Sequence, residues 1–360
     1  MANEMAKKEA TAVVNKQPRP VDLIVMHIRP HFDEVLAVYL LKAYGKTFFT
    51  GVGDASIETW GEGKMLKEYG GKTADDLLRE QKILCIGTCG GMFDEHVNGE
   101  LTCAHLVAEY LGVIDRPELQ KILQFCKRVD HDGKSMPFDL HSTMKEMYDF
   151  FGDGDDGMQT VYNWAMQAIE SCVFGQKQFH ACAEEFKKTG NIINGGPVKI
   201  ALVTSDNPKM HKWIRHFHSA DIIVKLKTTG NMIILTSPQK VKKVIDMRDL
   251  ARIVRETELK KRKLAVPQWK ILESDGAVNE CPWWYYYKNG EQLLNGTVTS
   301  PDVEPTALSL TDMARAIALA CAPKVDPCTA SKCYKTCNKY QHGLIACRQK
   351  RFNLKKGGER

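Results

Sequence analysis

The feature that most constrains this chain is a set of histidine- and acid-rich clusters placed directly after apolar segments. The first cluster, His27–Glu34, follows the apolar run Val21–Met26, which predicts a buried strand. The second, Gly90–His96, follows another apolar run, Ile83–Gly87. Polar side chains at strand ends, just before helices, are typical of the sheet edge at which α/β proteins bind their ligands. The sequence therefore predicts an α/β fold with a metal site at one edge of a sheet.

Two later clusters carry less information. Asp130-His131-Asp132-Gly133 closes a predicted helix, and its carboxylates are candidates to bridge metal ions. A weaker group, His211, His216 and His218, lies on or near a basic helix. Each cluster also has a plainer interpretation, as a helix cap, an exposed turn or a solvated helix face.

Alternating strands and helices over residues 21–190 predict a parallel sheet covered on both faces. The strands are expected at 21–28, 47–52 and 82–87, and the helices at 33–44, 64–80, 101–111, 117–128 and 158–188. The run Asn194–Pro197 indicates a linker, and a second, smaller α/β domain is expected over residues 198–320. Its strands are expected at 198–204, 221–227 and 232–236, its helices at 208–217, 246–263 and 311–320, and an irregular segment at 274–303. Within that segment Cys281–Tyr287 is favoured as a strand in packing contact, with stacking on bases or sugars as the alternative.

Composition narrows the class of protein. A hydrophobic content of 43% and a charged content of 26% are typical of globular proteins. No apolar stretch reaches the roughly 18 residues of a membrane-spanning helix, so no membrane association is expected. Residues 1–20 lack the apolar segment of a secretory signal, which predicts a flexible N-terminus and a cytoplasmic protein with reduced thiols.

The positive charge lies at the C-terminal end. Residues 327–360 contain nine Lys/Arg and one acid, a net of +8, so the rest of the chain carries about −2 of the total of +6. A basic tail is a common electrostatic anchor for nucleic acid, and a disordered, solvated end is the alternative.

The same tail, residues 321–360, concentrates metal-binding side chains. Cys328, Cys333, Cys337, His342 and Cys347 predict a structural Zn²⁺ site, with a disulfide cluster or an unstructured segment as alternatives. Basic residues interleave with tyrosines there, which suits phosphate contacts and base stacking. The expected nucleic-acid-binding residues are Lys335, Lys339, Arg348, Lys350 and Arg351.

The order of the clusters resembles the DHH-type phosphoesterase superfamily. The nearest branch is the melanocyte-proliferating-gene family, also called metal-dependent protein hydrolases. The resemblance is carried by three motifs over residues 21–190: His27…His31-Phe-Asp33-Glu34-Val-Leu-Ala, Asp94-Glu95-His96, and Asp130 with Asp132 as the alternative. It implies a DHH-like phosphoesterase domain that binds Mn²⁺, with Mg²⁺ or Zn²⁺ as alternatives.

The resemblance also implies roles for single residues. His31 and Asp33 would bind one metal, Asp94 and Asp130 would bridge or bind a second, and His27 would be a further ligand. His96 would bind metal or stabilise the leaving group, which places His96, Asp94 and Asp130 in the catalytic set.

Two departures separate this chain from the family pattern. Cys85 or Thr88 stands where the family has an Asp at the end of its third strand, and Glu95 replaces the middle histidine of the triplet. We expect an enzyme that hydrolyses phosphodiesters in RNA or short oligonucleotides. The alternatives are a catalytically degenerate scaffold that binds nucleic acid, and a pyrophosphate or cyclic-dinucleotide hydrolase.

Overall fold

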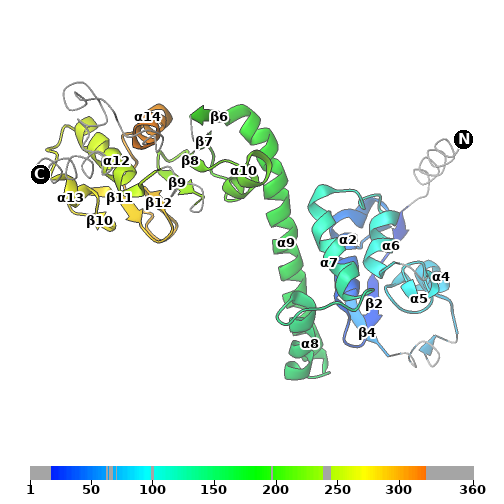
Figure 1. The fold of residues 1–360 in the computed structure, drawn as a ribbon. Coiled ribbons are helices and arrows are strands. Elements are labelled where there is room, and N and C mark those ends of the chain that lie inside the picture. The colour runs from blue at the N-terminus through cyan, green and yellow to red at the C-terminus, as the bar shows by residue number, and fades with distance from the viewer. Residues whose placement is uncertain are drawn as a thin grey trace, which may run out of the picture. The chain divides into compact units, whose positions relative to one another are not determined.

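The computed structural model describes residues 18–321 except 62–63, 65–67, 70, 99–100, 196–197 and 238–244. The chain divides between Lys177 and Gln178 into two compact units (Figure 1). Among the described residues no helix is both long and apolar enough to cross a membrane. The tail residues predicted to bind zinc and nucleic acid, and most of the predicted flexible N-terminus, lie outside the described residues.

The first unit is built on a three-stranded parallel sheet of order β4-β2-β5. The central strand β2 (Leu23–His27) pairs with β4 (Ser56–Trp60) and with β5 (Ile83–Cys85). A separate two-residue pair joins β1 (Arg19–Pro20) to β3 (Phe49–Thr50). Because a central parallel strand is covered on both faces, β2 reads as the continuous apolar run seen in the sequence. Its buried residues Ile24, Val25 and Met26 confirm that interpretation.

Helices pack around this sheet and form the main hydrophobic core of the first unit with it. α2 is buried along nearly its whole length, and it packs against α6 within that core. The helical elements of the first unit are α2 (Phe32–Tyr44), the 3₁₀ turn η2 (Gly45–Thr47), α4 (Ala74–Asp76), the π-helical turn η3 (Leu77–Gln81), α5 (Glu95–Asn98), α6 (Cys103–Tyr110), α7 (Pro117–Val129), α8 (Leu140–Phe151) and α9 (Asp155–Thr189), which runs on into the second unit.

The second unit contains a seven-stranded mixed sheet of order β10-β11-β12-β9-β8-β7-β6. Only β7 and β8 pair in parallel; every other neighbouring pair is antiparallel. The strands are β6 (Gly190–Gly195), β7 (Val198–Thr204), β8 (Ile222–Leu226), β9 (Met232–Thr236), β10 (Gly276–Val278), β11 (Cys281–Tyr287) and β12 (Gln292–Leu294). The helices are α10 (Met210–His218), α12 (Met247–Lys261), α13 (Trp269–Leu272) and α14 (Leu310–Ala320). The predicted α/β class is therefore confirmed for both units.

Three expectations were wrong in detail. The second strand of the first sheet is β4, whereas the predicted strand 47–52 is mostly turn and contributes only β3. Asn194 and Gly195 of the expected linker instead belong to β6, which pairs antiparallel with β7. The segment 274–303 is not irregular, since it supplies β10, β11 and β12. The aromatic run within it is the strand β11, as favoured, and Trp284 and Tyr286 are buried in the core.

Candidate metal centre

Glu34 is fixed by the connection from β2 to α2. Its Oε1 accepts a hydrogen bond from the His27 backbone N–H at 2.9 Å, and its Oε2 accepts one from the His31 N–H at 2.8 Å. The His27 Nδ1 lies 3.2 Å from the same Oε1. A carboxylate in the first turn of a helix is favoured by the exposed N–H groups and the helix dipole. Glu34 therefore caps the N-terminus of α2, and its two carboxylate oxygens also fix the backbone of His27 and of His31.

Gly87 allows this arrangement from the neighbouring strand. It follows β5 with a φ of +63°, and an added Cβ would lie 2.9 Å from the Glu34 Cγ. Glycine is the residue that adopts this backbone conformation without a steric cost. The close approach of backbone to Glu34 explains why the second apolar run ends in glycine.

Asp33 is the most deeply buried acid of the site, with 1% of its surface exposed. Its Oδ2 accepts a hydrogen bond from the Cys103 thiol at 2.9 Å and one from the Cys103 N–H at 3.3 Å. Burial, followed by the negative charges of Asp130 and Glu34, raises the pKa of Asp33 well above its ordinary value. A carboxylate in this position needs a nearby positive charge to be ionised.

The second cluster begins the short helix α5. The Asp94 carboxylate accepts hydrogen bonds from the Gly90 N–H at 2.8 Å and the His96 N–H at 3.0 Å, and its Oδ1 lies 3.1 Å from the His96 Nδ1. Beside it, the Glu95 Oε2 is buried without a hydrogen-bond partner among the described residues. Burial raises the pKa of Glu95. An unsatisfied buried carboxylate oxygen is costly unless a ligand contacts it.

Asp130 joins the first cluster from the end of α7. Its Oδ1 lies 3.8 Å from the His31 Nδ1. Burial raises the pKa of Asp130, and His31 partly offsets this effect. The next two residues turn away from the site, since His131 and Asp132 pair with each other at 3.0 Å on the surface.

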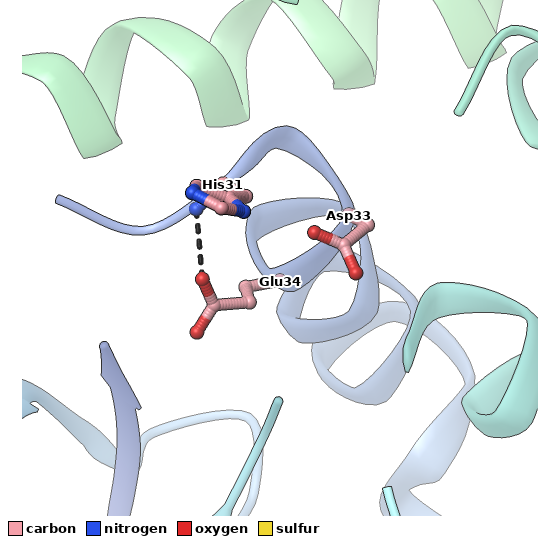
Figure 2. Close-up of side chains that lie close together, drawn as sticks. All are labelled: His31, Asp33 and Glu34. Carbon is pink, nitrogen blue, oxygen red and sulfur yellow. Dashed lines mark hydrogen bonds between the residues drawn. The ribbon is translucent and has the colours of Figure 1, made fainter. Parts of the chain in front are cut away.

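The structure brings the clusters together because β2 and β5 are parallel neighbours and their carboxyl ends meet at one edge. Among the described residues, three groups of side chains could hold a metal ion, each with ligand atoms within 4.8 Å of one another. They are His31 with Asp33 and Glu34, Asp33 with Glu95 and Cys103, and Asp94 with Glu95 and His96. Figure 2 shows the first group, with Glu34 folded back beneath His31 and the Asp33 carboxylate on the other side of the helix start.

The donor atoms fit a hard divalent cation. Asp33, Glu34, Glu95 and Asp130 form no ion pair with a lysine or arginine among the described residues. Carboxylate and imidazole donors suit Mn²⁺, Mg²⁺ or Zn²⁺. Burial raises the pKa of the Cys103 thiol, so this sulfur is a neutral hydrogen-bond donor to Asp33.

The three groups contain residues that were not predicted as ligands, and they lack two residues that were. Glu34, Glu95 and Cys103 belong to them, although the sequence assigned none of the three as a ligand. His27 and Asp130 were predicted as ligands and belong to none, while His27 lies 6.2 Å from His96 between ring centroids. Glu34 and Glu95 could have been predicted as ligands, because each directly follows a predicted ligand, Asp33 or Asp94. Cys103 carried no local signal, because its contact with Asp33 spans 70 residues.

Of Cys85 and Thr88, the two residues predicted to stand in place of the family's third-strand Asp, Cys85 is a buried thiol. Cys85 ends β5 and lies in a small core with Trp60 and Leu77. A hydrogen bond with Cys89, together with burial, raises the pKa of Cys85 and keeps it protonated. Cys85 therefore packs as a neutral side chain beside the carboxylates.

The weaker histidine group has a structural role in the second unit. His216 and His218 lie on α10 among aromatic rings, with centroid distances of 4.6 Å from His216 to Phe217 and 4.8 Å from His218 to Phe186. Burial lowers the pKa of His211 and of His218. None of the three belongs to a group of potential metal ligands in the described part of the chain.

No protein-family model and no curated protein matches this chain. Among solved structures, it is similar to an uncharacterized protein from Helicobacter pylori G27, with 10% identity over 84% of this chain and 99% of that chain and a TM-score of 0.22. It is also similar to a structure described as the DHH domain of a member of the S1p family of ribosomal proteins, with 12% identity over 69% of this chain and 80% of that chain and a TM-score of 0.22. Likenesses this weak carry no argument about fold or function, so the family resemblance stays a prediction.

Proposed function

We propose that the first unit is a metal-dependent phosphodiester hydrolase. The observation that carries this proposal is the meeting of buried carboxylates from the ends of two parallel strands, without a lysine or arginine paired to Asp33, Glu34 or Glu95 among the described residues. Buried like charges are unfavourable unless a cation or protons neutralise them. A divalent cation supplies that charge, and phosphoester hydrolysis is a chemistry for which such cations are widely used.

Individual residues have separable roles in this proposal. Asp33 and His31 would hold a cation at the end of β2, and Asp94 and Glu95 would hold one after the end of β5. A bound Mn²⁺ would lower the pKa of a water molecule and polarise the phosphoryl oxygen. Asp94 fixes the His96 ring through Nδ1, which leaves Nε2 to bind metal or to donate a proton to the leaving oxygen.

RNA or a short oligonucleotide is the proposed substrate class. The family resemblance implies it, and the net charge of +8 over residues 327–360 favours an anionic polymer. Lys335, Lys339, Arg348, Lys350 and Arg351 are the proposed contacts.

A non-catalytic nucleic-acid-binding protein is the second candidate. One observation favours it: Cys85, which with Thr88 stands where the family that the chain resembles has an acid, is a buried, protonated thiol. On this interpretation Glu34 is retained as a helix cap and the tail makes the nucleic-acid contacts.

Hydrolysis of labelled single-stranded RNA in Mn²⁺ distinguishes the two. Asp33→Asn keeps the size of the side chain and removes its charge, and we expect it to lower the rate by about 10³-fold, on the scale of losing a group that acts in the transition state. Asp115→Asn is the matched control, because Asp115 is exposed and lies just before the start of α7, at the opposite end of that helix from Asp130. RNA that is bound but left uncut by the parent protein would support the second candidate.

A further inference from the structure

A cavity of about 230 Å³ lies beside the candidate metal centre in the first unit. It is enclosed by the segment from Arg29 to Phe32 and by the side chains of α8. His31, a member of the first ligand group, is one of its lining residues. The volume is below the roughly 300–1,000 Å³ of pockets that enclose a whole drug-sized ligand, so it suits one group of a larger molecule.

The charges around the cavity leave one cation available. Arg29 donates from Nη1 to the Asp149 Oδ1 at 2.8 Å and also pairs with Asp153, so its guanidinium is already shared between two carboxylates, one of which lines the cavity. Lys145 also lines the cavity, is exposed, and forms no ion pair with another described residue. The cavity therefore presents a free ammonium group next to the metal centre.

A buried histidine adds a neutral polar group. His141 is 5% exposed, lines the cavity, and makes no hydrogen bond to another described residue. Burial, followed by the charge of Lys145, lowers the pKa of His141, so its imidazole is neutral and offers one N–H donor near neutral pH.

We propose that this cavity binds a second, non-scissile phosphate of the substrate, with Lys145 and His141 as the contacting residues. The ammonium group supplies charge, the imidazole N–H supplies a directed hydrogen bond, and His31 joins the cavity to the metal centre. The inference rests on the proposed hydrolase function and narrows its substrate to esters that carry a neighbouring phosphate. Simple diesters with a single phosphate leave the cavity empty.

The test compares binding of 5′-phosphorylated diadenylate with that of its 5′-hydroxyl form to the full-length protein, by calorimetry in chelator. The parent should bind the phosphorylated form about tenfold more tightly, since one charge-assisted contact to a partly exposed phosphate is involved. Lys145→Ala should remove this preference and Lys145→Arg should restore it. Lys46→Ala is the matched control: Lys46 is exposed and lies beyond the far end of α2, about 20 Å along the helix from His31.

Equal affinity of the parent for the two dinucleotides, or no measurable binding of either, would overturn the inference. So would a loss of preference of the same size in Lys46→Ala. Hydrolysis in Mn²⁺ is measured on the same variants. A preference that depends on Lys145 without any hydrolysis supports the cavity and contradicts the hydrolase. Hydrolysis by a parent without the preference supports the hydrolase and contradicts the cavity.

Discussion

The two units of this chain bury charged side chains in opposite ways. In the second unit Glu258 is fully buried and accepts hydrogen bonds from the Arg262 Nε at 2.7 Å, the Trp284 Nε1 at 3.1 Å and the Ala307 N–H at 2.9 Å. Arg255, also fully buried, donates to the carbonyl oxygens of Leu272, Ser274, Gly276 and Trp284. The fold itself satisfies both groups.

The first unit leaves two of its acids, Asp33 and Glu95, without a lysine or arginine partner among the described residues. Within the same part of the chain Asp33 receives hydrogen bonds from Cys103 alone, and one oxygen of Glu95 receives none. The contrast teaches that burial of charge alone does not mark a site. A site is indicated where several buried acids lie close together and no lysine or arginine is paired with them. Of the two regions compared here, the ends of β2 and β5 in the first unit meet this condition.

The largest predicted effect is on the stability of the satisfied region. Glu258→Ala leaves the Arg262 guanidinium and the Trp284 N–H without their acceptor, so the free energy of unfolding of the second unit should fall by about 3–5 kcal/mol. Urea unfolding followed by pulse proteolysis, with fragments assigned to each unit, measures it. A loss below about 1 kcal/mol would show that Glu258 is not satisfied in the way described.

The next largest loss of stability is expected from steric crowding at Glu34. Gly87→Ala forces a Cβ to 2.9 Å from the Glu34 Cγ at a positive φ, and should lower the unfolding free energy of the first unit by about 2–3 kcal/mol. Gly90→Ala is the matched control, because its φ of +65° is similar but nothing lies within 4 Å of the added Cβ. It should cost only about 1 kcal/mol. Equal losses in the two variants would mean that Glu34 does not occupy this position.

The pH dependence of the metal-free protein sharpens the comparison further. The pKa of Asp33, Glu95 and Asp130 is raised in the folded state, so each of these groups binds more protons in the folded than in the unfolded chain between its ordinary and its raised pKa. Their contribution to stability is therefore greatest below the ordinary carboxyl pKa and is lost as the pH rises through the raised values. Asp33→Asn removes one of these contributions, so the stability of the variant relative to the parent should increase with pH in chelator. A stability difference between the two proteins that does not change with pH would contradict the raised pKa of Asp33.

The smallest effect is expected at an exposed pair of the second unit. Arg248 pairs with Asp246 at 2.6 Å on the surface, where water and salt screen the interaction. Arg248→Ala should lower the unfolding free energy by less than about 1 kcal/mol. Urea unfolding of Arg248→Ala and Glu258→Ala under the same conditions compares the two losses of unfolding free energy. Losses of similar size would contradict the distinction between buried and exposed charges.

Local pattern predicted much of the fold. β7 and β9 coincide with the expected ranges, and α2 begins one residue early, because apolar runs and helical spacing are properties of neighbouring residues. β4 was missed because it is an edge strand whose exposed and half-buried residues alternate, and it has little apolar signal. The strands of segment 274–303 were missed because β10 and β12 are only three residues long and β11 contains Pro282, which is unusual inside a strand.

The candidate site was predictable only in part, for a similar reason. Asp33, Asp94 and His31 follow apolar strands, so their place at the sheet edge could be inferred from order along the chain. The contact of Cys103 with Asp33 and the orphaned oxygen of Glu95 depend on which loops fold together, which no local spacing encodes. The lining of the cavity by His141 and Lys145 depends on how α8 packs against the residues after β2.

The most direct test of the missing counter-charge is a titration of the metal-free full-length protein with Mn²⁺, followed by the electron paramagnetic resonance signal of free Mn²⁺. The tail is also predicted to bind metal, so parent and Asp33→Asn are compared at the same protein concentration. We predict that the parent takes up at least one Mn²⁺ more than Asp33→Asn does, because Asp33 belongs to two of the three ligand groups. Equal uptake by the two proteins would contradict a metal centre at the ends of β2 and β5.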